Sequence, residues 1–270
     1  MTKEMQKKSF FPKRHLRLLA IYVVPIFVLV AGATPHAGWA KDGGKEIQFG
    51  DADVFLELNN TDGDLGFHSS IDGDAWKYLR IEDPRGRKIL NILTGGKLRR
   101  HGLTQLDFES AEPSFDDLNP RVFFRRFPEG EYEIEGRTID GQKMESTAML
   151  THVLPGPPQN IAVNGVELPD GCDEPPVLDV SGSLVITWDE VTESHPELGR
   201  TGEPVEVVYY QVVLEQIDLG LAFTAELPPE ATEIIVPETF SDYGGAFKLE
   251  ILVKEESGNK TATETCFAIE

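Results

Sequence analysis

Positive charge is scarce in this sequence, and the shortage excludes one class of partner. The chain has 25 Lys and Arg against 46 Asp and Glu. Six of those cations and one acid lie in the first 40 residues, which leaves 19 against 45, a net charge of −26, for the remainder. Such a surface repels phosphate backbones, so we expect no nucleic-acid partner. It suits a soluble exported protein, and it attracts divalent cations weakly.

Motifs for catalysis and for tight metal binding are also missing. Ser181-Gly182-Ser183 lacks the flanking glycines of a nucleophile elbow. Carboxylate pairs are expected by chance among so many acids. The histidines beyond residue 40 do not have the spacing of metal ligands. They are His68, His101, His152 and His195. We therefore expect no enzyme activity, no catalytic residue, no cofactor site and no metal site.

The only long hydrophobic run, Leu18–Ala33, is short for a transmembrane helix. It has about 16 residues, Pro25 interrupts it, and a span needs roughly 20. A basic head precedes the run, and Gly38-Trp39-Ala40 follows with small residues at the minus-3 and minus-1 positions. This pattern predicts a signal peptide over 1–40, cleaved after Ala40. A retained anchor is the alternative; we do not expect a bacterial lipoprotein anchor, because no cysteine lies near the cut.

Cysteine is nearly absent: the chain has two, Cys172 and Cys266, both in the exported part. In an oxidising compartment we expect them to form a disulfide. Two free thiols are the alternative. The predicted localisation is periplasmic or secreted, with no stable membrane insertion after cleavage.

Short alternating segments fill the region from Asp53 to Val153. Apolar and polar residues alternate with a period of two, and turn residues recur about every ten positions, which is typical of an all-β sandwich. Ser114–Phe127 differs, because its apolar residues have helical spacing and Arg125 and Arg126 end it. We predict a short helix there. The expected strands are 54–58, 65–71, 76–81, 88–93, 103–109, 130–136 and 143–153.

Pro155-Gly156-Pro157-Pro158 divides the chain, because a strand cannot run through it. It predicts a stiff joint between domains at 45–154 and 157–270. In the second domain, Ser183–Asp189 and Val205–Glu215 both alternate. We expect them in opposite sheets, with Trp188 packed against the aromatic and aliphatic face of Tyr210.

The turn Pro128–Tyr132 resembles the entry to the penultimate strand of immunoglobulin-like sandwiches. There a tyrosine hydroxyl closes a corner of the fold. The resemblance implies that role for Tyr132. The predicted first domain is thus immunoglobulin-like, with a helical crossover.

Residues 157–269 resemble a fibronectin type III module, which implies a seven-strand Greek-key sandwich. Phe247 stands where that family has a corner tyrosine, so the corner bond is absent or Tyr243 supplies it. An inserted connection, Glu167–Val180, carries Cys172. In the implied topology it lies at the same end as Cys266. The resemblance rests on Pro157-Pro158, Leu184–Trp188, Tyr210-Gln211-Val212, Phe247–Val253, Ser257-Gly258-Asn259 and Thr261–Ile269.

Two clusters of polar residues are candidate sites. An acidic turn region resembles a calcium loop, but Leu65 replaces the required Gly and Ile71 the final Glu, so ordinary Asx-rich turns are the favoured interpretation. It comprises Asn60, Asp62, Asp64, Asp72 and Asp74. A basic island either binds a polyanion, docks on the acidic second domain, or is simply solvated. It comprises Lys97, Arg99, Arg100, His101, Arg121, Arg125 and Arg126.

Trp76 and Trp188 fit core positions better than sugar platforms. Asn59-Asn60-Thr61 and Asn259-Lys260-Thr261 match the glycosylation pattern. We expect a non-enzymatic binding or spacer protein that acts through protein–protein contacts, its partner an unidentified protein or polysaccharide. The alternatives are a carbohydrate- or calcium-binding accessory module and an enzyme with its site at the domain junction.

Overall fold

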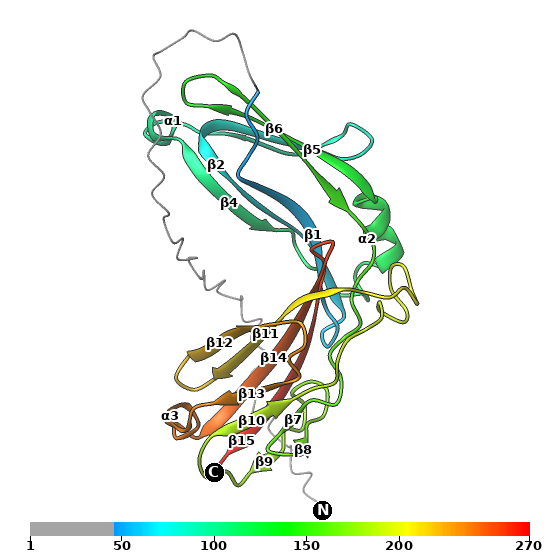
Figure 1. Cartoon of the computed structure of the whole chain (residues 1–270), viewed down its shortest axis with the longest axis vertical. Coiled ribbons are helices and arrows are strands. Elements are labelled where there is room, and N and C mark those ends of the chain that lie inside the picture. Colours follow the sequence, from blue (N-terminus) through cyan, green and yellow to red (C-terminus); the bar gives the residue numbers. More distant parts are fainter. Residues whose placement is uncertain (1–45) are drawn as a thin grey trace, which may run out of the picture. The chain divides into compact units, whose positions relative to one another are not determined.

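Strands dominate the part of the chain that the computed structural model describes, residues 46–270 (Figure 1). The predicted signal peptide, 1–40, lies outside the described residues. Within 46–270, none of the helices has the length and apolar character needed to cross a bilayer. The all-β prediction is confirmed.

The first group of strands forms a two-layer sandwich. One layer contains β4, the first part of β2, and β1; the other contains β3, the second part of β2, β5 and β6. Two short helices, α1 and α2, lie in the connections. The strands and helices are β1 (Asp51–Asn59), β2 (Asp64–Glu82), β3 (Lys88–Leu93), α1 (Leu98–His101), β4 (Leu103–Glu109), α2 (Pro120–Arg126), β5 (Gly130–Thr138) and β6 (Lys143–Leu150).

The long strand β2 belongs to both layers of this sandwich. We predicted separate strands at 65–71 and 76–81, with the turn signal Asp72-Gly73 between them, whereas the structure has one strand whose pairing register shifts between Asp72 and Trp76. A bulge bends a strand and lets it pass from one sheet to the other. Glycine suits the bend, because a Cβ on Gly73 would lie 2.9 Å from the Met144 Cε atom.

The helix α2 is shorter than the predicted Ser114–Phe127. It begins at Pro120, and the Asn119 side chain accepts a hydrogen bond from the backbone N–H of Arg121 at 3.0 Å. Asn at the N-cap followed by Pro strongly favours the start of a helix at that position. The helix therefore begins at Pro120 and not at the acidic residues before it. Arg125 and Arg126 end the helix as predicted.

The second group of strands is a sandwich with the strand order of a fibronectin type III domain. One sheet has the order β13-β10-β7-β8, and the facing strands have the order β12-β11-β14-β15. The predicted packing of Trp188 on Tyr210 is confirmed, with ring centroids 5.5 Å apart. The elements are β7 (Ala162–Val163), β8 (Val166–Glu167), β9 (Val177–Leu178), β10 (Leu184–Thr187), β11 (Val207–Gln216), β12 (Leu221–Leu227), β13 (Glu233–Val236), α3 (Glu238–Ser241), β14 (Gly245–Glu255) and β15 (Lys260–Ile269).

Buried apolar side chains form two separate clusters, one in each sandwich. Trp76, Phe67 and Tyr132 lie in the first, and Trp188 and Phe247 lie in the second. The Pro-rich segment at 155–158 runs between them. It is not the only connection, however, because β1 pairs in parallel with β15 from Glu57↔Lys260 to Asn59↔Ala262. One eleven-stranded sheet therefore runs through both sandwiches.

The structure contains the predicted disulfide between Cys172 and Cys266, with Cα atoms 4.9 Å apart. Cys172 lies in the connection between β8 and β9, and Cys266 lies in β15. The bridge ties that inserted connection to the sheet, 94 residues apart in sequence. A disulfide is consistent with an oxidising compartment.

Candidate functional site

A row of side chains crosses the outer face of the second layer of the first sandwich. Leu93 on β3 is opposite Tyr78 on β2, Tyr78 is opposite Arg137 on β5, and Arg137 is opposite Lys143 on β6. Successive strand residues point to opposite faces. Leu79 and Ile81 consequently fill the core while Tyr78 and Arg80 face outward.

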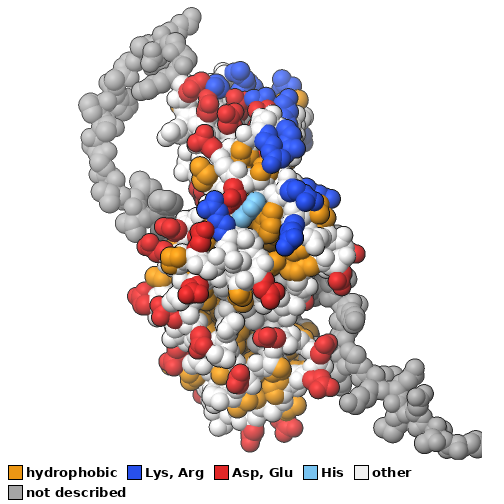
Figure 2. Space-filling view, turned by 90° about the vertical axis from the view of Figure 1, so that its right-hand side faces the viewer, with side chains coloured by type: hydrophobic (Ala, Val, Ile, Leu, Met, Phe, Trp, Pro, Cys, Tyr) orange, Lys and Arg blue, Asp and Glu red, His pale blue; other side chains and the backbone are white. Residues whose placement is uncertain are grey.

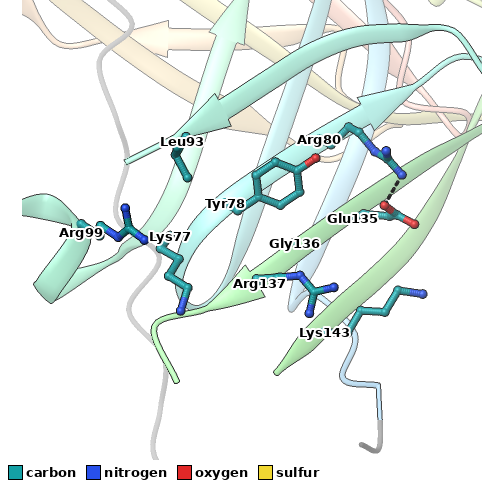
Figure 3. Close-up of a pocket in the computed structure, with 9 residues that line it drawn as sticks. All are labelled: Lys77, Tyr78, Arg80, Leu93, Arg99, Glu135, Gly136, Arg137 and Lys143. Atoms are coloured by element: carbon teal, nitrogen blue, oxygen red, sulfur yellow. Dashed lines mark hydrogen bonds and ion pairs between the residues drawn. The ribbon is translucent and has the colours of Figure 1, made fainter. Parts of the chain in front are cut away.

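This outer face contains a depression of about 520 Å³. We call the depression and the residues that line it the basic face (Figure 3). Tyr78 and Arg137 lie in its middle; Lys77 and Arg99 lie at one end, and the Arg80–Glu135 pair at the other. Arg99 comes from α1, so helix and sheet both contribute. The residues that line it are Lys77, Tyr78, Arg80, Leu93, Arg99, Glu135, Gly136, Arg137 and Lys143.

Neighbouring acids neutralise two of the five cations. Burial disfavours the charged form of Arg80, but Glu135 and Glu82 outweigh this and raise the pKa of the guanidinium. Hydrogen bonds to Glu145 and Glu46 raise the pKa of the Lys143 ammonium. Both side chains stay charged, yet their charge is already balanced.

The other three cations have no ion-pair partner among residues 46–270. Lys77 donates a hydrogen bond from Nζ to the Ile139 carbonyl oxygen at 2.9 Å, which leaves its charge uncompensated. Arg99 and Arg137 offer guanidinium donors of the kind that grip carboxylates and phosphates. The basic face can therefore receive anionic groups.

The predicted basic island is divided by the fold. Arg99 lines the basic face, while Arg121, Arg125 and Arg126 belong to α2, which Figure 1 shows on the other side of the first sandwich from α1. None of the ion pairs found within 46–270 joins Arg99 or Arg100 to the second sandwich. The ion pairs that join the two sandwiches involve other side chains, such as Arg200 of the second sandwich, which pairs with Glu129 of the first at 2.8 Å.

Four of the five cations on the basic face were not predicted from the sequence: Lys77, Arg80, Arg137 and Lys143. Alternation puts Arg80 between the buried Leu79 and Ile81, and Arg137 between the buried Gly136 and Thr138, so these two side chains face outward. The sequence does not show which strands are neighbours in the sheet, because the pairing of β2 with β5 joins residues about 55 positions apart. Only the register brings the cations together.

A second polar site lies where the sandwiches meet. Asn259, in the turn between β14 and β15, is completely buried. Its Oδ1 atom accepts a hydrogen bond from the Leu56 N–H at 2.7 Å. Its Nδ2 atom donates to the carbonyl oxygens of Val153 at 2.8 Å and Thr151 at 3.1 Å. The glycosylation pattern at Asn259 is thus inaccessible, since the amide nitrogen is occupied by the fold.

The acidic turn region that we compared with a calcium loop is divided between two places in the fold. Asn60 and Asp62 lie in the β1–β2 turn and Asp64 begins β2, whereas Asp72 and Asp74 lie at the bulge. The Asn60 Oδ1 atom is 3.0 Å from the His195 Nε2 atom. Burial, together with Glu112 and further acids, raises the pKa of Asp64 to about 7. No cluster suited to a metal ion occurs among the described residues.

The histidines have separate structural contacts. His68 lies 3.2 Å from Glu112 and stacks on Phe55. The His152 Nε2 atom lies 2.8 Å from the Phe127 carbonyl oxygen. Burial lowers the pKa of His195. His152 and Arg99, whose clustering would have supported a catalytic site at the domain junction, lie apart, because Arg99 lines the basic face.

The aromatic predictions have mixed outcomes. Trp76 is fully buried, so it cannot serve as a sugar platform. The corner role of Tyr132 is confirmed: its hydroxyl donates to the Pro128 carbonyl oxygen at 3.0 Å. In the second sandwich Phe247 is buried without a hydroxyl, and Tyr243 is 52% exposed. There the Tyr210 hydroxyl accepts a hydrogen bond from the Val191 N–H at 2.8 Å.

Comparison with known proteins gives structural likeness only. No family model and no curated protein matches the sequence. Among solved structures, the FN1–FN3 domains of chicken CNTN1 align at 11% identity over 84% of this chain and 65% of theirs, with a TM-score of 0.35. A two-domain fibronectin type III segment of chicken tenascin aligns at 12% identity over 84% of this chain and 99% of the segment, with a TM-score of 0.27.

A tetra-tandem repeat from the extending region of a large adhesion protein aligns at 10% identity over 82% of this chain and 50% of the repeat, with a TM-score of 0.27. This chain thus spans less than two thirds of the CNTN1 and adhesion-protein structures. The fold assignment rests on the strand order described above.

Proposed function

We propose that this is an exported, non-enzymatic binding protein that holds an anionic partner on its basic face. The observation that carries the proposal is the set of uncompensated cations, Lys77, Arg99 and Arg137, around one depression in a strongly acidic chain. Isolated surface cations are ordinary. Three around one concave surface, beside Tyr78 and Leu93, provide charge, hydrogen-bond donors and apolar contact together.

The distribution of charge supports this proposal. Residues 46–154 contain 13 Lys and Arg against 21 Asp and Glu, whereas residues 155–270 contain 4 against 23. The space-filling view shows the same contrast, with cations gathered over the first sandwich (Figure 2). An anionic partner is attracted to the first sandwich and repelled by the second. The second sandwich then acts as a rigid support or spacer.

The joint between the sandwiches is consistent with a spacer role. The β1–β15 pairing and the buried Asn259 connect the two cores through backbone groups as well as through the Pro-rich segment. Such a joint resists bending more than a flexible linker does. The protein would hold the basic face at a fixed distance from whatever contacts its other end.

The test uses dextran sulfate as a soluble polyanion. Wild-type protein is expected to bind immobilised dextran sulfate and to elute with salt. The double variant R99E/R137E should lose roughly a hundredfold in affinity, because each charge-assisted hydrogen bond is worth about 1.5–3 kcal/mol.

The matched control is R125E/R126E, which makes the same change in net charge on α2. If both double variants weaken binding equally, attraction is general and the basic face is not the site. If wild-type protein does not bind at low salt, the proposal is wrong.

A further inference from the structure

We infer that the anionic partner is a phospholipid membrane, on which one end of the first sandwich docks peripherally. This inference rests on the proposed function and names its ligand. The docking surface, which we call the basic tip, combines cations with exposed apolar side chains. It consists of Lys77, Leu93, Lys97, Leu98, Arg99 and Ile139.

The apolar members distinguish a membrane from a soluble polyanion. Leu93 is 64% exposed, Leu98 51% and Ile139 36%. They lie together: Leu93 and Arg99 line the same depression, and Lys77 bonds to the Ile139 carbonyl oxygen. Exposed leucines flanked by cations are what an anionic lipid interface favours, since apolar groups enter it while cations meet the headgroups. A polyanion needs only the cations.

The backbone around α1 presents these side chains outward. Gly96 and Gly102 have positive φ values, 53° and 80°, and they bracket α1. None of the α1 residues is buried. The segment therefore projects Leu98, Arg99 and Arg100 away from the core instead of packing them on it.

The acidic residues outside the basic tip favour one orientation of the molecule on an anionic membrane. Acids also lie near the tip, including Asp74 and Asp140, while Glu46 and Glu145 are occupied by Lys143. The second sandwich, with 4 Lys and Arg against 23 acids, is repelled by an anionic surface. Attraction at one end and repulsion at the other favour docking through the basic tip.

The experiment is vesicle sedimentation with a chain that starts at Lys41. Both cores lie within 46–270, so this chain keeps the complete folded unit and lacks the apolar run. Binding is expected to vesicles in which phosphatidylglycerol replaces about a third of the phosphatidylcholine, and not to phosphatidylcholine alone. The variant L93S/L98S should bind these vesicles about thirtyfold more weakly, because two exposed leucines no longer enter the interface.

The matched control is L219S/L221S, which removes two exposed leucines from the second sandwich. The vesicle binding of L219S/L221S should equal that of the wild type. Binding to dextran sulfate without binding to anionic vesicles would overturn this inference and leave the proposed function standing. Binding to neither would overturn both. Equal vesicle binding by L93S/L98S and the control would show that the leucines do not insert, which also overturns the inference.

Discussion

Replacing Asn259 with alanine is expected to weaken the joint between the two sandwiches. The side chain is completely buried and contacts three backbone groups of the first sandwich and the following segment: the Leu56 N–H, the Val153 carbonyl and the Thr151 carbonyl. Alanine removes every partner at once. The Leu56 N–H, on a fully buried residue, and the two carbonyls, on half-buried residues, then lose these hydrogen bonds.

The magnitude follows from the cost of a buried polar group without a partner, about 1–3 kcal/mol each. At the lower end of that range, three groups cost about 3 kcal/mol. A chain of this size loses roughly 2–4 °C in Tm per kcal/mol, so N259A should melt roughly 6–12 °C below the wild type.

The assays are thermal melting, which gives Tm, and urea unfolding, which gives the free energy of unfolding, both with the disulfide intact and followed by far-UV circular dichroism. The control is N91A, which removes an exposed asparagine from β3 and should change stability by less than about 0.5 kcal/mol. A loss for N259A no larger than that of N91A would refute the reasoning. It would mean that the carbonyls find other partners and that the joint does not depend on this side chain.

Three further predictions concern stability. The variant C172S/C266S should lose about 4 kcal/mol in the free energy of unfolding, because the bridge closes a loop spanning 94 residues; a loss below about 1 kcal/mol in urea unfolding would contradict the chain-entropy argument. Y132F should lose about 1 kcal/mol with its corner hydrogen bond, whereas Y243F, at an exposed tyrosine, should not. Burial first, and then Glu112 and other acids, raise the pKa of Asp64 to about 7 in the folded state. The folded state therefore holds the Asp64 proton more tightly than the unfolded state, and stability decreases as pH rises toward 7. D64N should accordingly exceed the wild type in stability near pH 8 and match it near pH 4, and a constant difference at both pH values would show that Asp64 does not titrate as described.

The sequence predicted the strands correctly where one face of the strand is buried. Alternation located β1, both parts of β2, β3 and β5 within a few residues, because burial of one face imposes a period of two. Alternation did not show that β2 is continuous. Asp72-Gly73 suits a hairpin turn and a bulge equally, and only the Phe49 and Met144 side chains packed against Gly73 decide between them.

The sequence predicted less of the candidate site than of the fold. Arg99 stood out because it lies in a run of basic residues, while Arg137 is the single cation on a strand with three glutamates and Lys143 is the single cation on β6. The same run misled the prediction by grouping Arg99 with Arg125 and Arg126. Basic residues that are close in sequence can be far apart in space, because α1 and α2 lie on opposite sides of the first sandwich.

By itself, the sequence determined the all-β class, the pairing of Trp188 with Tyr210, the corner formed by Tyr132 and the bridge between the two cysteines. The first two features depend on local periodicity, the corner on the resemblance of Pro128–Tyr132 to an immunoglobulin-like turn, and the bridge on the lack of any other partner for either cysteine. Only the tertiary structure decided the pairing of β1 with β15, the burial of Asn259 and the convergence of Lys77, Arg99 and Arg137. Strand register creates those contacts between distant segments, and register is fixed by how side chains fill a shared core, which no single segment encodes.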